Sequence, residues 1–269
     1  MDIAAAFFRA RCSGLSSPRD ATTSVVRQGD GMSADLHFWF DPVCPFAWMT
    51  SKWVRMVAEQ RAYDVEWRLI SLRLLNKHID YDSHFPPEYE AGHTAGLRLL
   101  RVCARVRAEH GAQALGPLYL ALGDRIWEQD PVEGQDVAGR VPGLARDALQ
   151  EAALPAELAD ALEDTSWDEE IQAETDAALA LTGKDVGTPI LHFQPPEGIA
   201  FFGPVISRLP DEAQAAQLWD HVVGLASFGG FAELKRSLRE LPQLPALGVP
   251  TDAVGKTEDW HGGSRRQKK

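Results

Sequence analysis

The amino-acid sequence predicts an α/β fold that carries a block of helices. Two observations predict the sheet: residues 36–72 read as strand, helix and strand in order, and strand character returns at 190–202. A strand, helix and strand in succession indicate a parallel pair, because a parallel connection must cross over one face of the sheet. Between these regions, residues 86–184 show only helical periodicity. We therefore expect one sheet domain with a helical insertion.

The first unit begins with a short aromatic run. Leu36 to Phe40 is apolar and is followed by Asp41-Pro42, as expected of a buried strand that ends at a turn. Apolar residues then recur at helical spacing from Cys44 to Gln60. Val65 to Leu72 reads as the second strand, although its alternation is imperfect.

Glycines and prolines divide the insertion into several helices. Its last helix is expected to start at Ser166, because Ser166 and Glu169 have the form of a capping box. Gly183 is a suitable stop for that helix. The insertion therefore ends just before the chain returns to the sheet.

Two strands and two helices complete the domain. Strand character returns at Ile190 to Phe193 and at Ile199 to Phe202, and the proline-rich turn between them predicts a hairpin. Helical periodicity then predicts helices over 211–226 and about 230–238. The sheet domain is expected to span residues 35–240.

The two ends of the chain show neither helical nor strand periodicity. Residues 1–34 mix Ser, Arg, Thr, Gly and Asp, so we expect a disordered extension, and Met32 is left open as the physiological initiator. Residues 241–269 carry three prolines and four glycines, a composition that does not sustain a helix or a central strand. We expect a second disordered tail there.

The composition restricts the classes of partner. Of 269 residues, 27 are Lys or Arg and 39 are Asp or Glu, a formal net charge of −12. An acidic surface repels phosphate backbones, and the one dense basic stretch is the last few residues, so no nucleic-acid partner is expected. No apolar run reaches the roughly 18 residues of a membrane span. These features predict a cytoplasmic protein with no membrane partner, either a monomer or a homodimer.

Three cysteines, Cys12, Cys44 and Cys103, stand at wide spacings. An odd number at such spacings argues against a disulfide framework and against a four-cysteine zinc site. The histidines lack metal-binding spacing, and no glycine-rich nucleotide loop follows the first strand. We therefore expect neither a metal ion nor a tightly bound cofactor.

Cys44 differs from the other two cysteines because it lies between the first strand and the first helix. Backbone N–H groups at a helix N-terminus, and the positive end of its dipole, stabilise a thiolate. Pro45 suits the first helical position, where no N–H is needed. The position favours a nucleophile, although a buried structural role is the commoner fate of a free cysteine. Cys103, among apolar helical neighbours, is expected to be structural.

Several separated runs resemble a known group of proteins. Cys44-Pro45-Phe46-Ala47 after an aromatic strand, and Val186-Gly187-Thr188-Pro189 before a late strand, resemble the thioredoxin-fold DsbA-like oxidoreductases, which also carry a helical insertion. More narrowly, the chain resembles the mycothiol-dependent nitroreductase family in the runs Phe38-Trp39-Phe40-Asp41-Pro42, Leu75-Asn76, Gly187-Thr188-Pro189 and Phe201-Phe202-Gly203-Pro204-Val205. The resemblance covers about residues 35 to 240.

The resemblance implies a fold and a set of site residues. The fold is thioredoxin-like with a helical insertion, Cys44 is the attacking thiol, and Thr188-Pro189 is a cis peptide opposite it. The Thr188 backbone is then a docking edge for a thiol or disulfide. Since only about 5 to 6% of X-Pro bonds are cis, the residues alone favour a strand-initiating Pro189. The remaining implied contacts are Pro45, Phe46, Trp48, Asn76 and Tyr89, of which Trp48 is equally suited to the core.

Ala47 departs from the Cys-Pro-x-Cys motif of typical relatives, so no disulfide can form within the motif. The chemistry that remains uses one thiol. Cys44 attacks a disulfide, or an electrophilic or nitro compound; a mixed disulfide forms with a low-molecular-weight thiol, and a second thiol resolves it. The resemblance implies mycothiol as that co-substrate, with glutathione as the weaker choice. Whether Cys103 acts as a resolving thiol stays open.

Two other functions stay open. Kappa-class glutathione transferases and chromene-carboxylate isomerases have the same fold, and in them a single Ser or Cys activates a thiol without an internal disulfide. The third alternative is a binding or scaffold protein that keeps the fold without turnover. It predicts a Cys44 thiol with a near-ordinary pKa.

Overall fold

The computed structural model describes residues 34–85, 88–130 and 137–260. Within them, four strands form one sheet in the order β2-β1-β3-β4. β1 and β2 are parallel, β3 is antiparallel to β1, and β4 is antiparallel to β3 and so runs in the direction of β1. This order and these directions are those of a thioredoxin-like fold, as the sequence implied. The strands are β1 (Leu36–Phe40), β2 (Val65–Leu69), β3 (Ile190–Phe193) and β4 (Ala200–Phe202).

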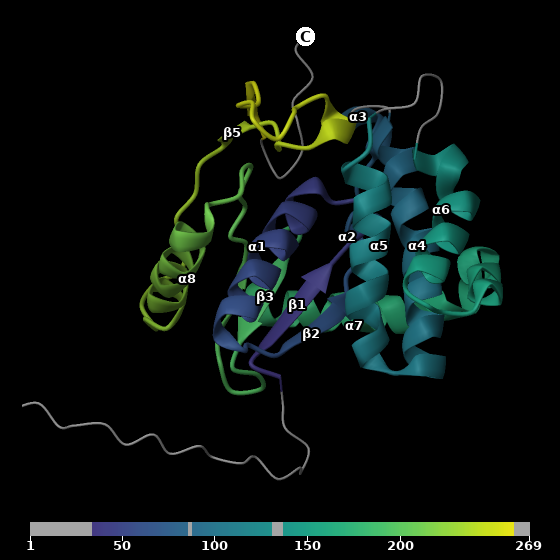
Figure 1. Ribbon diagram of the computed structural model, residues 1–269, viewed down its shortest axis with the longest axis horizontal. Coiled ribbons are helices and arrows are strands. Elements are labelled where there is room, and N and C mark those ends of the chain that lie inside the picture. Colours follow the sequence, from purple (N-terminus) through teal and green to yellow (C-terminus); the bar gives the residue numbers. More distant parts are fainter. Residues whose placement is uncertain (1–33, 86–87, 131–136, 261–269) are drawn as a thin grey trace, which may run out of the picture. The chain divides into compact units, whose positions relative to one another are not determined.

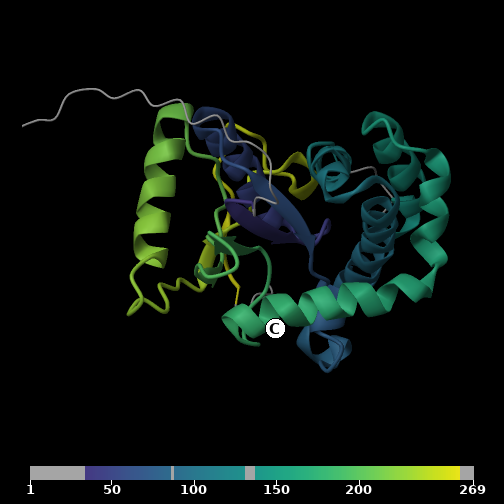
Figure 2. The same cartoon turned by 90° about the horizontal axis from the view of Figure 1, so that it is seen from below.

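Helices cover both faces of this sheet (Figures 1 and 2). On one face lie α1 (Pro45–Arg61), the crossover between β1 and β2, and α8 (Glu212–Ala226). Trp53 of α1 packs on Trp219 of α8, with ring centroids 5.3 Å apart. On the other face, Ala178 of α7 (Asp168–Thr182) packs with buried residues of β1 and β3. The sheet is therefore buried on both sides.

A block of helices stands between β2 and β3, where the sequence predicted a helical insertion. It contains α4 (Glu88–His110), α5 (Leu115–Trp127), α6 (Val137–Glu151), α7 and three 3-10 turns at Ala112–Ala114, Ala156–Glu163 and Thr165–Trp167. Buried Glu174 of α7 ties this block to the sheet. Its carboxylate accepts from Arg68 of β2 at 2.9 Å and from Arg107 of α4 at 2.6 Å.

Three local predictions need correction. Ser166 lies within a 3-10 turn capped by Asp164, so α7 begins two residues later than the capping-box pattern indicated. Between β2 and α4 the chain forms short helices α2 (Leu72–Leu75) and α3 (Tyr81–His84) that the periodicity did not reveal, because each has one turn.

The third correction concerns the end of the chain. The helix predicted over about 230–238 is absent from the described residues; instead this segment is exposed and leads into β5 (Leu238–Glu240). The predicted tail is also wrong for residues 241–260, which form a 3-10 turn (Pro245–Leu247) and β6 (Thr257–Asp259). Prolines do exclude a helix there, but a two-stranded ribbon tolerates them outside its paired positions. The rest of the predicted extensions, residues 1–33 and 261–269, lies outside the described residues.

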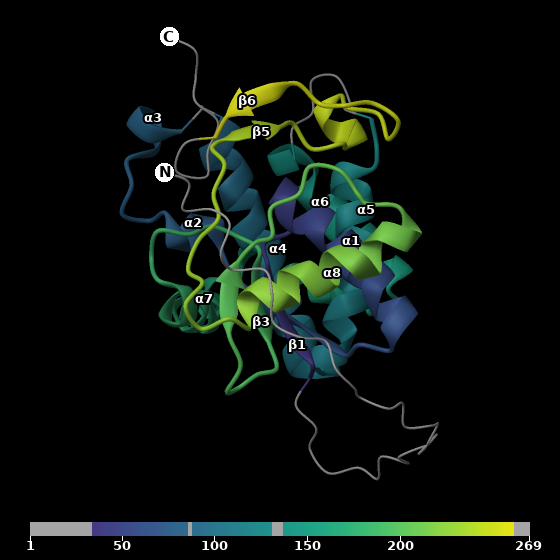
Figure 3. The same cartoon turned by 90° about the vertical axis from the view of Figure 1, so that its left-hand side faces the viewer.

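The ribbon of β5 and β6 lies across the N-terminal end of α1 (Figures 1 and 3). The two strands are antiparallel, and Trp260 donates its backbone N–H to Ser237 at 3.0 Å. Leu244, Val249 and Trp260 are buried and anchor the segment. In the described ranges, no helix is long and apolar enough to cross a membrane.

Gly123 on α5 marks the tightest packing between the insertion and α1. A Cβ atom at this position would overlap the six-membered ring of Trp48, which is fully buried. We expect Gly123→Ala to lower the free energy of unfolding by about 1–3 kcal/mol, because the core cannot take the added volume. Chemical denaturation measures this.

Gly143 on α6 is the matched control. Nothing lies within 4 Å of a Cβ placed there. Gly143→Ala is expected to raise the free energy of unfolding by up to about 1 kcal/mol through helix propensity alone. Equal effects of the two substitutions would contradict the packing argument.

Candidate active site

Cys44 is the residue that caps the N-terminus of α1. A turn leads from β1 to it, closed by its backbone N–H donating to Asp41 O at 3.0 Å. Its sulfur accepts from the backbone N–H of Ala47 at 3.4 Å, and Pro45 occupies the first helical turn. The thiol therefore lies at a helix N-terminus, where the sequence placed it.

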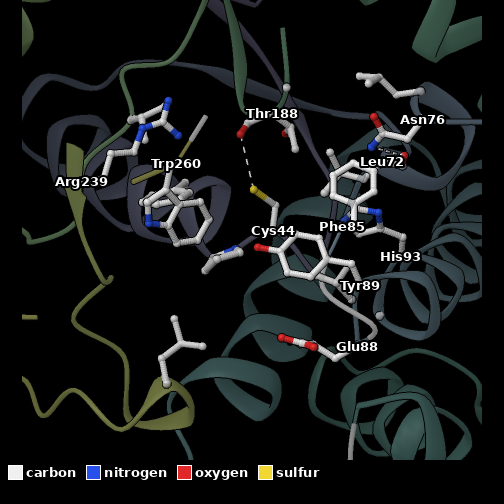
Figure 4. Close-up of a pocket in the computed structure, with 18 of the residues that line it drawn as sticks. Cys44, Leu72, Asn76, Phe85, Glu88, Tyr89, His93, Thr188, Arg239 and Trp260 are labelled. Atoms are coloured by element: carbon white, nitrogen blue, oxygen red, sulfur yellow. Dashed lines mark hydrogen bonds between the residues drawn. The ribbon is translucent and has the colours of Figure 1, made fainter. Parts of the chain in front are cut away.

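The loop before β3 faces this sulfur. Thr188-Pro189 is a cis peptide, as the resemblance implied. The Cys44 thiol donates to the backbone carbonyl of Thr188 at 3.4 Å (Figure 4). The hydroxyl of Thr188 in turn donates to Trp39 O on β1 at 3.2 Å. The loop is thus fixed to the sheet, with its carbonyl aimed at the thiol.

A cavity of about 330 Å³ opens beside the sulfur. Its walls are mostly apolar and aromatic, and they come from the turn before α1, from α2 to α4, from the cis-proline loop and from the β5–β6 ribbon. Of the residues predicted from the sequence, the cavity is lined by Cys44, Pro45, Phe46, Asn76, Tyr89 and Thr188. The fold therefore brings together residues from four separate parts of the chain.

Two predicted contacts lie elsewhere. Trp48 is fully buried: its indole N–H donates to Glu128 at 2.6 Å, and its ring packs edge-on against Tyr119. It points into the core because it lies on the face of α1 that meets α5, so the prediction of a substrate contact at Trp48 is wrong for this structure. Pro189 is not among the residues that line the cavity, but it belongs to the cis peptide that presents the Thr188 carbonyl.

The sequence reasoning missed the wall formed by the ribbon. Trp260 lies edge-on to Phe46 with ring centroids 4.7 Å apart, and the guanidinium carbon of Arg239 lies 5.5 Å from the centroid of the same ring. Figure 4 shows both side chains on one side of the cavity, away from Asn76 and His93. The available signal was Trp260, a large aromatic residue within a segment predicted to be a disordered tail.

A cluster of rings from α3 and α4 forms the opposite wall. Phe85 and Tyr89 stack with centroids 5.5 Å apart, and both contact the ring of His93. Burial, and then the charge of Arg73, lower the pKa of His93 to about 4. The imidazole is therefore neutral at physiological pH and pairs with the Tyr81 hydroxyl at 3.0 Å.

Burial decides the protonation of Cys44. It raises the pKa of the thiol to about 12, and the charge of Asp41 adds to this; the N–H groups of Ala47 and Phe46 and the charge of Arg239 act in the opposite direction. The sequence argument considered the helix N-terminus alone and expected a thiolate. In this conformation desolvation is the larger effect, so the thiol is neutral.

Asp41 fixes the turn that carries Cys44. Its carboxylate is fully buried and accepts from Val43 N at 3.1 Å and from Leu72 N at 2.8 Å. Burial raises its pKa to about 7, against the effect of these two hydrogen bonds. Asp41 therefore joins the start of α1 to the start of α2, and its charge opposes ionisation of the thiol.

Among the residues that the structure describes, no group of acidic, histidine or cysteine side chains could hold a metal ion. The cavity is lined by the Cys44 thiol, the Thr188 loop and the guanidinium of Arg239, together with the polar side chains of Asn76, Glu88, Tyr89 and His93. The site is suited to reactions at sulfur.

A thioredoxin-like sheet, a cysteine at the N-terminus of the first helix and a cis-proline loop facing its sulfur define a thiol oxidoreductase of the thioredoxin-fold class. The particular family follows from comparison of sequences. A family model described as mycothiol-dependent nitroreductase Rv2466c matches residues 43–236, and the chain belongs to this Rv2466c-like family of oxidoreductases.

Other known proteins are similar to the chain. The uncharacterized protein Rv2286c of Mycobacterium tuberculosis (strain ATCC 25618 / H37Rv) is 30% identical over 214 residues, 78% of this chain and 83% of that protein. The structure of the cytosolic disulfide reductase DsbM from Pseudomonas aeruginosa matches at 17% identity and a TM-score of 0.45, over 71% of this chain and 99% of that one. A 2-hydroxychromene-2-carboxylate isomerase matches at 15% identity and a TM-score of 0.44, over 71% and 95%. The fold assignment rests on the strand order and not on these two structures.

Removal of Trp260 is expected to make Cys44 more reactive. Burial is the largest cause of the raised thiol pKa, and Trp260→Ala opens the wall beside Phe46 to water. The midpoint of the pH dependence of Cys44 alkylation should fall below about 12. At a fixed pH near 8 the alkylation rate should rise about tenfold, since one pKa unit is a factor of ten in thiolate.

Alkylated-peptide mass mapping distinguishes Cys44 from Cys103 in this experiment. Val254→Ala is the control, because Val254 lies in the same segment but is exposed. Equal alkylation rates in wild type and Trp260→Ala would show that the ribbon does not control access to the thiol.

The raised pKa of Asp41 is expected to make the free energy of unfolding depend on pH. Its pKa is 3.8 in the unfolded chain and about 7 in the folded protein, so between these values the folded state holds a proton that the unfolded state has released. The contribution of Asp41 to the free energy of unfolding is therefore highest below about pH 4 and falls by up to about 4 kcal/mol as the pH rises to about 7. Asp41→Asn should lack this component.

Urea unfolding of both proteins across this pH range tests the assignment. The stability difference between Asp41→Asn and wild type should shift in favour of the variant as the pH rises. A difference that is independent of pH would mean that Asp41 is not a buried titrating group.

Proposed function

We propose that this protein is a mycothiol-dependent reductase that works through the single thiol of Cys44. One observation carries the proposal: the Cys44 sulfur faces both the Thr188 carbonyl and the cavity, while Ala47 stands where a second cysteine would be. Cys103 is fully buried in α4 and does not line the cavity. The second sulfur of the cycle therefore comes from a small thiol in solution.

The proposed cycle balances with two molecules of thiol. The Cys44 thiol and one mycothiol together give two electrons and two protons to the acceptor, and a disulfide bond forms between them. A nitro group is thereby reduced to a nitroso group with release of water. A second mycothiol thiolate attacks the mycothiol sulfur of this mixed disulfide, which frees the Cys44 thiolate and releases oxidised mycothiol.

A disulfide acceptor would be reduced by thiol–disulfide exchange at Cys44. The Cys44 thiolate attacks one sulfur, the S–S bond breaks, and the other sulfur leaves as a thiolate. A mycothiol thiolate then displaces Cys44 from the resulting mixed disulfide. In both cases the Thr188 carbonyl lies where an incoming thiol can donate a hydrogen bond beside the sulfur.

The neutral thiol must lose its proton before the sulfur attacks. Because desolvation is the main cause of its high pKa, exposure of the sulfur to water would lower the pKa. The N–H group of Ala47, at 3.4 Å, remains in place to stabilise the thiolate. Movement of the ribbon is the proposed route to the reactive state.

The walls of the cavity favour a planar acceptor. Phe46, Phe85, Tyr89 and Trp260 offer aromatic faces and edges against which a ring can stack. A nitroaromatic compound fits this description, in agreement with the description of the family.

A second function is favoured by one observation, the neutral thiol that acts as a hydrogen-bond donor. Such a thiol could donate to a bound glutathione or mycothiol thiolate, as proposed for a transferase or isomerase of the kappa type. That function predicts conjugation or isomerisation with no stable mixed disulfide. If the protein is a binding protein without turnover, neither conjugation nor isomerisation is expected, and no mixed disulfide cycle.

The adduct on Cys44 separates these functions. After exposure to oxidised mycothiol, intact-mass analysis is expected to show one mycothiol adduct on wild type and on Cys103→Ser, and none at position 44 in Cys44→Ser. Thiol-dependent reduction by Cys44→Ser should fall at least about 100-fold, because the nucleophile is lost.

Other outcomes would contradict the single-thiol cycle. An internal disulfide between Cys44 and Cys103 would replace it with a dithiol cycle. Undiminished turnover by Cys44→Ser would remove Cys44 from the reaction.

A further inference from the structure

Arg239 of β5 is the single Lys or Arg among the described residues that line the cavity. It is half-buried against Phe46, and its side chain has no hydrogen bond or ion pair with any other described residue. The adjacent Glu240 does not neutralise it, because Glu240 pairs with Arg208 at 2.9 Å. Among the described residues, no carboxylate lies within ion-pair distance of this guanidinium at the cavity.

An unpaired, half-buried cation is costly unless something compensates it. Burial lowers the pKa of Arg239, with the nearby Cys44 acting in the opposite direction. Elsewhere in the described chain, partly or fully buried arginines donate to protein groups: Arg68 and Arg107 share Glu174, Arg101 pairs with Asp168 through two hydrogen bonds, and Arg55 donates to the carbonyl of Gly116. Arg239 therefore differs in having its donors available to a ligand.

The position of Arg239 also fixes how a ligand would lie. The guanidinium carbon is 5.5 Å from the centroid of Phe46, so a ring placed against Phe46 and Trp260 brings its substituent within reach of Arg239. Cys44 and the Thr188 carbonyl lie at the same cavity. The planar fork of a guanidinium matches a carboxylate with two parallel hydrogen bonds.

We propose that the substrate of this cavity is an aromatic compound that carries a carboxylate, and that Arg239 binds the carboxylate. The protein has a net charge of −12, which repels anions in general, so a carboxylate needs such a local cation to enter. Glu88 also lines the cavity, on α4 and away from Arg239 in Figure 4. The inference rests on the proposed function, since it names the class of acceptor.

A pair of matched probes tests the proposal. 4-Nitrobenzoate and its neutral analogue 4-nitrobenzamide differ in one charge and little in shape. Calorimetric titration is expected to show that wild type binds the carboxylate at least about tenfold more tightly than the amide, as for a charge-assisted hydrogen-bonded pair. In Arg239→Met the preference should disappear, while the affinity for the amide changes less than about threefold.

Arg236→Gln is the matched control. Arg236 lies three residues earlier in the same segment, is exposed and does not line the cavity, so the preference for the carboxylate should persist. Rates of mycothiol-dependent reduction of the two probes should follow the same order as the affinities.

Three results would overturn the inference. The first is equal binding of both probes by wild type, and the second is an unchanged preference for the carboxylate in Arg239→Met. The third is that Arg239→Met loses turnover equally with both probes and has a higher Cys44 pKa, which would mean that Arg239 acts on the thiolate. Binding by Cys44→Ser separates this proposal from the proposed function: a retained carboxylate preference supports the Arg239 site even if turnover does not require Cys44.

Discussion

The two hydrogen bonds that the Asp41 carboxylate accepts hold the site together. They join the turn after β1 to the start of α2, and Cys44 follows that turn directly. If the turn moved, the sulfur would lose both the N–H of Ala47 and the carbonyl of Thr188. The same carboxylate raises the pKa of the thiol. One residue therefore fixes the position of the Cys44 thiol and makes its ionisation harder.

This conflict explains why a cysteine at a helix N-terminus is a neutral thiol here. The helix offers two backbone N–H groups that favour the thiolate, but Cys44 is buried and its thiol pKa is raised by the loss of water around it. Desolvation acts on the whole charge, whereas each hydrogen bond offsets part of it. The balance changes in the direction of the thiolate if water reaches the sulfur, so access to the cavity and reactivity of the thiol are coupled.

The sequence predicted those features whose cause is local. The cap at Cys44, the helix after it and the extent of the insertion depend on neighbours a few residues away, and each was predictable. The cis peptide at Thr188-Pro189 required the resemblance, since residue types alone favour trans. The wall of Arg239 and Trp260 was not predictable, because it depends on pairing of β5 with β6 and on burial against Phe46, some two hundred residues away. Trp48 shows the converse. It lies close to Cys44 in the sequence, but this closeness does not determine which face of α1 carries its side chain.

The ribbon of β5 and β6 combines two properties that the proposed reductase would need. The family model ends at residue 236, so β5 and β6 lie beyond the part of the chain that it matches. Trp260 of this segment packs on Phe46 at the cavity, and Arg239 supplies the one Lys or Arg among the described residues that line it. An anionic aromatic ligand would compensate Arg239 and stack on Phe46 at the same time. Selection of the acceptor and control of thiol ionisation would then depend on one segment, while the thioredoxin-like sheet supplies the sulfur and the cis-proline carbonyl.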